Sequence, residues 1–182
     1  MPTAYRSLTS TTRLAWTLAL PLRTGVLYFV NASLPQRRRP AHGVYVDLSA
    51  PTIVWVTVCT KQREKWLSSE KAHRCLLKAW ACAGAWLVGR YILLPDHLHL
   101  FCAPVDLSKT LTAWVTYWKR RFTQAAQEPT WQWQAGYWDT RLRRHENYTE
   151  KWHYALRNAV EAGLVEQPED WPYQGEINQL RW

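Results

Sequence analysis

The chain has 182 residues, of which 47% are hydrophobic and 20% charged, a composition that suits one folded domain and excludes an intrinsically disordered protein. Lysine and arginine total 23 against 14 aspartate and glutamate, and the resulting net charge of +9 favours a polyanionic partner such as nucleic acid. Many of the 13 tryptophans must be core residues in a domain of this size, but indole faces also stack on unpaired bases. No run approaches the ~20 apolar residues of a membrane span, so we expect no membrane partner.

By composition the chain divides into an N-terminal extension, residues 1–50, and a folded domain, residues 51–182. A proline and an arginine interrupt the apolar stretch at 14–30, which argues against a signal peptide. The extension ends in a basic, proline-flanked segment that is either a plain linker or an arm lying along a phosphate backbone, with Arg37, Arg38 and Arg39 at its centre. None of the four cysteines forms a C-x-x-C pair, which argues against a zinc ribbon and is typical of a reducing cytoplasm.

Hydrophobic periodicity and turn signals predict seven elements in the domain. A β-branched strand at 52–59 is followed by a helix that Ser68 or Ser69 caps and that runs to about Ala83. The remaining elements are a strand at 85–94, a strand at 97–102 after a turn at Pro95 and Asp96, a helix at 107–126, a short strand at 136–142, and a helix at 147–162 closed by Gly163. This order predicts an α+β fold, a ferredoxin-like sandwich with helices on one face of an antiparallel sheet.

Two histidines, His97 and His99, flank a leucine in the third predicted strand. Because side chains alternate along a strand, both imidazoles point to one face of the sheet. Two neutral imidazoles side by side form half of a divalent metal site. An H-x-H pair taken alone favours a structural role, and the preceding Asp96 either orients an imidazole or forms the turn.

The last predicted helix places Tyr154 and Asn158 four residues apart, about 40° around the helix axis and therefore on one face. If a metal held by His97 and His99 lies opposite that face, Asn158 supplies a third ligand and Tyr154 is a nucleophile for a phosphodiester. In isolation, a tyrosine at this position is typical of a packed helix aromatic.

Three blocks of the sequence resemble the REP-associated tyrosine transposases, which belong to the single-tyrosine HUH transposases. They are GRYILLPDHLHLF at 89–101, WQAGYWDTRLR at 133–143 and YTEKWHYALRNAVEAGLV at 148–165, in the order in which the family has them. The resemblance covers roughly residues 52–171. One departure is Ala159, where the family usually has a proline that shapes the helix beside Asn158.

The resemblance implies that His97, His99 and Asn158 hold Mg²⁺ or Mn²⁺ and that Tyr154 is the nucleophile on the C-terminal helix. It also implies a substrate of single-stranded DNA folded into hairpins by repetitive palindromic sequence, with a short guide sequence beside the hairpin. The expected product is a 5′-phosphotyrosine that another strand reseals. A monomer and a homodimer both remain open, and the expected location is the bacterial cytoplasm at the nucleoid.

Basic and aromatic residues outside this set are candidates for the DNA path. The basic candidates in the domain are Lys119, Arg120, Arg121, Arg141, Arg143 and Arg144, and the stacking candidates are Trp114, Trp118 and Trp138. Two other functions stay open. One is a non-catalytic hairpin-binding protein derived from a transposase, and the other is a metallonuclease that uses water instead of Tyr154.

Overall fold

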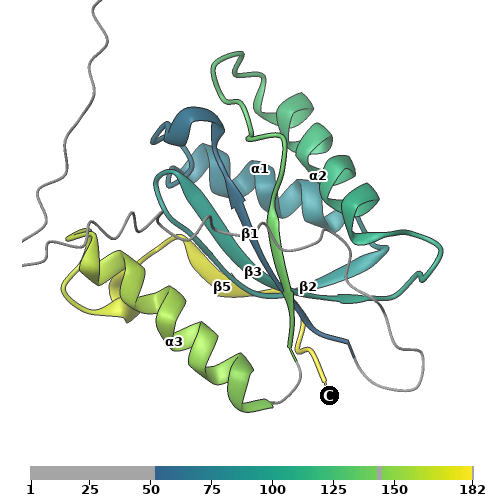
Figure 1. Cartoon of the computed structure of the whole chain (residues 1–182). Helices are drawn as coiled ribbons and strands as arrows, with labels where there is room; N and C mark the ends of the chain where they lie inside the picture. The colour runs from purple at the N-terminus through teal and green to yellow at the C-terminus, as the bar shows by residue number, and fades with distance from the viewer. Residues whose placement is uncertain (1–51, 143–144, 182) are drawn as a thin grey trace, which may run out of the picture. The chain divides into compact units, whose positions relative to one another are not determined.

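The computed structural model describes residues 52–142 and 145–181 (Figure 1). The predicted extension at 1–50, its arginines Arg37, Arg38 and Arg39, and the pair Arg143 and Arg144 lie outside the described residues. None of the helices in the described part of the chain is both long and apolar enough to cross a bilayer.

Five strands form one antiparallel sheet in the order β4-β1-β3-β2-β5, so β3 lies at the centre of the sheet between β1 and β2. The strands are β1 (Val54–Cys59), β2 (Trp86–Leu93), β3 (His97–Pro104), β4 (Trp138–Arg141) and β5 (Gln174–Glu176). The helices are α1 (Glu70–Ala81), α2 (Leu111–Ala126) and α3 (His145–Glu161), with short 3-10 turns η1 (Lys61–Arg63) and η2 (Pro168–Asp170).

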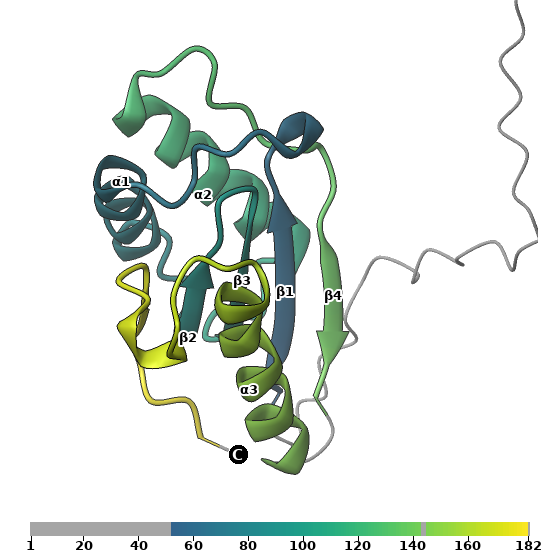
Figure 2. The same cartoon turned by 90° about the vertical axis from the view of Figure 1, so that its left-hand side faces the viewer.

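The helices cover both faces of the sheet (Figure 2). Alternation along the strands sends Val56 and Leu100 into one apolar core, which α1 and α2 complete, and Trp55 and Phe101 into a second core beneath α3. The α+β class and the antiparallel sheet are as predicted. The expectation of helices on one face holds for α1 and α2, whereas α3 covers the other face because the large apolar rings there also need burial.

Capping and turn residues determine where helices α1 and α2 begin. Ser69 caps α1 by accepting a hydrogen bond from the backbone N–H of Ala72 at 3.3 Å, as expected for a serine at this position. Helix α2 begins later than predicted, after the cap Thr110, because the Asp106 carboxylate accepts the N–H of Ser108 at 2.9 Å and holds the preceding residues in a turn. The short strand β5 and the two 3-10 turns were not predicted.

Candidate active site on the sheet face beneath helix α3

The two histidines of the H-x-H pair lie side by side on β3, facing α3. Their ring centroids are 4.9 Å apart, and the rings are nearly perpendicular, at 86°. Leu98 between them is fully buried in the opposite core. The alternation expected of a strand therefore brings His97 and His99 to one surface.

Each imidazole is held through its Nδ1 atom by a different neighbour. Nδ1 of His97 lies 2.6 Å from Oδ1 of Asp96, and Nδ1 of His99 lies 2.8 Å from Oγ1 of Thr57. Thr57 is in place because it pairs with His99 in the β1–β3 register. In the tautomer that donates Nδ1–H to these oxygens, each ring keeps the lone pair of its Nε2 atom for another partner, which is the usual arrangement of histidines that bind metals.

Burial keeps both imidazoles neutral. His99 is only 6% exposed, and this burial, helped by the nearby charges of His97, Lys151 and Arg63, lowers its pKa to about 3. Burial also lowers the pKa of His97, although its contact with Asp96 opposes the shift. A neutral imidazole is the form that binds a metal ion, so the site is prepared for a ligand at neutral pH.

Helix α3 brings Asn158 and Tyr154 to the same place. Nδ2 of Asn158 is 3.4 Å from Nε2 of His99, and the ring centroid of Tyr154 is 6.3 Å from that of His99. Rotation of the Asn158 amide by 180° exchanges its nitrogen for its oxygen and turns a metal ligand toward His99. Tyr154 and Asn158 share one face of α3, as the helical spacing predicted, and this face lies opposite His99.

Tyr154 differs from Tyr148 on the same helix and from Tyr137 in the opposite core because it is not packed. Its side chain is 59% exposed, which is unusual for a helix aromatic and contradicts a purely structural role in the core. By contrast, Tyr148 stacks on Phe101 with ring centroids 3.9 Å apart, and the hydroxyl of the buried Tyr137 lies 2.8 Å from Oγ1 of Thr112. Tyr154 is therefore the tyrosine whose hydroxyl a large substrate can reach at this site.

Small residues set the distance between α3 and the sheet. Ala155 and Ala159 are fully buried against the sheet, in the same core as Trp55 and Phe101. At Ala159 an alanine replaces the proline usual in the family that the sequence resembles, and α3 continues regularly to Glu161. The substitution leaves Asn158 facing His99, so the position of the amide does not depend on a proline.

The donor set fits a divalent metal with open positions. In the described part of the chain, no cluster of three or more His, Cys, Asp and Glu side chains could hold a metal, and the Asp96 carboxylate contacts Nδ1 of His97. The Asn158 amide is thus the available third donor beside the two Nε2 atoms. Two imidazoles and an amide oxygen leave coordination positions for substrate oxygens, as catalytic rather than structural metal sites do.

Four residues of this site carried no signal in the sequence. Thr57 holds His99, and Trp55 stacks on the His99 ring with centroids 4.8 Å apart. Lys151 places its ammonium 6.0 Å from the Trp55 ring, one turn before Tyr154 on α3, and Arg63 binds Asp96 at 3.0 Å. A single threonine or arginine in a strand or loop has no distinguishing sequence pattern. Only the strand register and the path of the loop show that such residues belong to the site.

Among the described residues, the basic candidates from the sequence are dispersed rather than gathered at this site. Lys119 is half-buried and donates hydrogen bonds to the backbone carbonyls of Gln134 at 2.9 Å and Gly136 at 3.1 Å, and burial lowers its pKa to about 8. Arg120 and Arg121 are exposed on α2, which covers the opposite face of the sheet. Arg141 pairs with Val54 and so emerges on that same opposite face.

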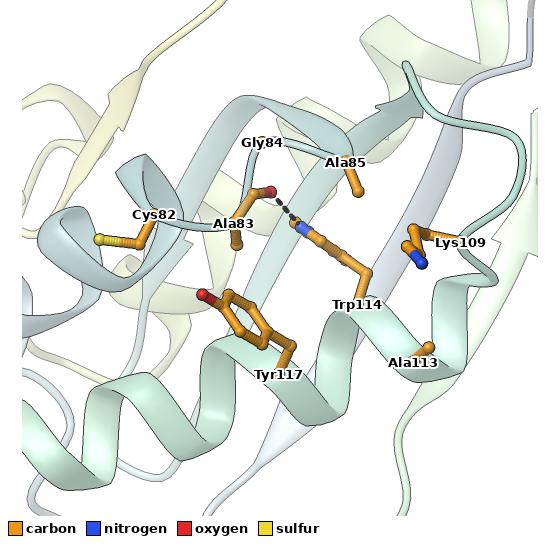
Figure 3. Close-up of a pocket in the computed structure, with 8 residues that line it drawn as sticks. All are labelled: Cys82, Ala83, Gly84, Ala85, Lys109, Ala113, Trp114 and Tyr117. Carbon is orange, nitrogen blue, oxygen red and sulfur yellow. Dashed lines mark hydrogen bonds between the residues drawn. The ribbon is translucent and has the colours of Figure 1, made fainter.

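Two of the three stacking candidates are core residues. Trp118 is fully buried, and Trp114 is 2% exposed. The indole N–H of Trp114 donates to the carbonyl of Ala83 at 2.7 Å, and the ring lines a hollow between α2 and the turn before β2 (Figure 3). Trp138 is 42% exposed, and because it pairs with Thr57 its ring lies on the face that carries His99. Trp138 is therefore the stacking candidate beside the site.

Comparisons with known proteins define the class of the fold. No protein-family model matches the chain, and no curated protein is similar to it in sequence. Among solved structures, it matches a REP-associated tyrosine transposase bound to a REP hairpin with a TM-score of 0.58 and 21% identity, over 72% of this chain and 81% of that one. The chain has the fold of that transposase, which confirms the family resemblance of the three sequence blocks at the level of the fold.

A second solved structure, a candidate transposase from Deinococcus radiodurans, matches with a TM-score of 0.44 and 15% identity, over 60% of this chain and 91% of that one. At this TM-score the second likeness carries no argument of its own.

Proposed function

We propose that this protein is a metal-dependent transposase that cuts and rejoins single-stranded DNA hairpins through Tyr154. The observation that carries the proposal is the convergence of Tyr154 and Asn158 on the Nε2 side of two histidines whose Nδ1 atoms are held by Asp96 and Thr57. The hairpin substrate is proposed from the matching transposase, which was solved with a REP hairpin.

In the proposed reaction, the Tyr154 hydroxyl oxygen attacks the phosphorus of the scissile phosphodiester and its proton passes to solvent. A bond forms between this oxygen and phosphorus, and the bond from phosphorus to the 3′-oxygen breaks. The 3′-oxygen leaves as a hydroxyl, and the 5′-phosphate remains on Tyr154. Attack by the 3′-hydroxyl of another strand reverses the same step and reseals the DNA, so no nucleotide triphosphate is needed.

His97, His99 and Asn158 would hold Mg²⁺ or Mn²⁺, which would act as a Lewis acid on the scissile phosphate. The chain's own side chains orient the reaction. Asp96 and Thr57 hold the Nδ1 atoms of the two imidazoles, and Lys151 adds positive charge near His99. Exposure of Tyr154 leaves room for a nucleic acid backbone.

The proposal is tested by incubating the purified full chain with end-labelled DNA hairpins that have single-stranded flanks, in Mn²⁺ or in EDTA. Denaturing electrophoresis should show a covalent protein–DNA band that forms only with the metal. Strand cleavage without this band would instead indicate a nuclease that uses water, and binding without cleavage or band would indicate a non-catalytic hairpin-binding protein.

Replacement of Thr57 by valine is expected to lower the affinity of the site for the metal, so that the reaction needs more of it. Valine has the shape of threonine but cannot accept the Nδ1–H of His99, and loss of such a partner typically costs 10–100-fold in metal affinity. We expect the Mn²⁺ concentration for half-maximal band formation to rise by about 10-fold or more. The control is Thr116→Val on the exposed surface of α2, and equal Mn²⁺ dependence of the two variants would contradict the assigned role of Thr57.

Replacement of Trp138 by alanine is expected to weaken binding to single-stranded DNA about 10-fold, since stacking of one base on an aromatic ring contributes ~1–3 kcal/mol. The exposed ring lies on the His99 face at the edge strand β4, so little core packing is lost. Fluorescence anisotropy with a labelled hairpin carrying a single-stranded flank measures the change. Tyr117→Ala, which removes an exposed aromatic ring from α2, should bind like the unaltered protein. A loss no greater than that of the control would exclude stacking on Trp138.

A further inference from the structure

A hollow of about 560 Å³ lies at the end of β1, where the connection from β1 to α1 meets the segment that precedes β4. Two backbone hydrogen bonds join the two segments. The N–H of Lys61 donates to the carbonyl of Gln132 at 2.8 Å, and the N–H of Gln134 donates to the carbonyl of Cys59 at 2.9 Å, which makes Thr60 and Trp133 an isolated antiparallel bridge. The hollow is therefore built by main-chain pairing and does not depend on flexible side chains alone.

The backbone of η1 at this hollow is strained. Gln62 and Arg63 are consecutive non-glycine residues in the left-handed region, with φ of 55° and 60°. Residues with a Cβ rarely occupy this region, and such strain is retained where the surrounding structure holds a loop for function. Here it is retained in a loop whose side chains from Lys61 to Lys65 are all exposed.

The side chains around the hollow combine positive charge with amides. Lys61 and Arg63 are cations, and their loop also contains Lys65 against one carboxylate, Glu64, so the local balance is positive. Three glutamine side chains line the same hollow, namely Gln62, Gln132 and Gln134. Cations of this kind bind phosphates, whereas amides both donate and accept hydrogen bonds and can therefore address the edge of a base.

Arg63 connects the hollow to the candidate active site. It lines the hollow, and its Nε lies 3.0 Å from Oδ2 of Asp96, whose other oxygen holds His97. The β1–β3 register pairs Cys59, the residue before this loop, with His97. A DNA strand whose phosphate lies at His97 and His99 could therefore continue past Arg63 into the hollow, since single strands follow basic grooves.

We propose that this hollow binds one unpaired nucleotide of single-stranded DNA next to the scissile phosphate, with its base against the glutamine amides and its phosphate at Lys61. The inference rests on the proposed function, because the phosphate at the histidines sets the position of the strand. The hollow would be a second binding site, outside the metal site, at which the protein distinguishes a single strand with bases from a bare sugar-phosphate backbone.

Binding to fluorescein-labelled oligothymidylate of about 20 nucleotides, to an abasic strand of equal length and to a duplex tests the inference with the full chain. The variants are Lys61→Ala and Gln134→Ala, with Lys78→Ala on α1 and Gln124→Ala on α2 as exposed matched controls. Arg63 is left unchanged because it also contacts Asp96. Thermal melting of each variant verifies that it is folded.

Lys61→Ala should weaken binding several-fold and lower the slope of log affinity against log salt by about 0.7, the value for one phosphate contact on a single strand. Gln134→Ala should reduce the preference for oligothymidylate over the abasic strand and leave the salt slope unchanged. A purely structural effect of Lys61 would not move the salt slope by this amount. The inference would be overturned if each variant bound DNA with the same affinity and salt slope as its control. It would also be overturned if a variant lost as much affinity for duplex DNA as for the single strand.

Failure of the inference can be told from failure of the proposed function. If the unaltered protein forms the covalent band and Lys61→Ala binds like Lys78→Ala, the hollow is not a nucleotide site and the transposase proposal stands. If no band forms with any hairpin while Lys61→Ala and Gln134→Ala show the changes above, the hollow binds DNA in a protein that does not cut it.

Discussion

Alanine in place of His97 is expected to lower the rate of covalent attachment to DNA by about 1,000-fold. Loss of one imidazole leaves His99 and Asn158 as donors, too few to hold a divalent ion firmly, and metal stabilisation of a phosphoryl transition state amounts to several kcal/mol. Because the His97 side chain is partly exposed, its removal should leave the stability of the folded protein nearly unchanged. Single-turnover formation of the covalent band in saturating Mn²⁺ gives the rate.

The matched control for His97→Ala is His153→Ala. His153 is exposed on α3 beside Tyr154, and no contact joins it to the metal donors in the described part of the chain. The control should react at the rate of the unaltered protein, and both variants should bind the labelled hairpin with similar affinity. A His97→Ala protein that reacts within a few-fold of this control would show that the H-x-H pair is structural.

Phenylalanine in place of Tyr154 should abolish covalent attachment, with any residual strand cleavage at least ~10⁴-fold slower than in the unaltered protein. The substitution removes one oxygen from an exposed ring, so neither the fold nor DNA binding should change appreciably. Tyr117→Phe, at an exposed tyrosine on α2, is the control and should retain full activity.

The Tyr154→Phe experiment also separates two mechanisms. If cleavage continues without a covalent band, water is the nucleophile and the chain is a hydrolytic metallonuclease. If a covalent band persists, another tyrosine reacts. Tyr148 is the nearest alternative on α3, but its ring is stacked on Phe101 and burial raises its pKa, both of which oppose nucleophilic attack.

Much of the site could be predicted because its patterns are local. The strand that carries His97 and His99 has a clear two-residue alternation, and the helix that carries Tyr154 and Asn158 is defined by its period and by Gly163. Each pair of residues is placed by the geometry of a single element. That the two pairs meet depends on the packing of α3 on the sheet, and in the sequence only the family resemblance indicated this meeting.

The features that could not be predicted depend on contacts between distant segments. Thr57 becomes a partner of His99 through the register of two strands, and Lys119 is directed to two backbone carbonyls by the path of the loop before β4. Strand β5 is only three residues long and has no apolar alternation, so it forms because β2 offers an unpaired edge. Residue type and spacing contain none of this information.

The most direct test of the central claim is to identify the residue that carries the DNA. The covalent complex formed by the unaltered protein in Mn²⁺ is digested with trypsin and nuclease, and the peptide that retains a nucleotide is sequenced by mass spectrometry. The proposed mechanism predicts a 5′-phosphate linked to the hydroxyl oxygen of Tyr154 and no complex in EDTA. A nucleotide attached to any other residue, or a complex that forms equally well without metal, would contradict it.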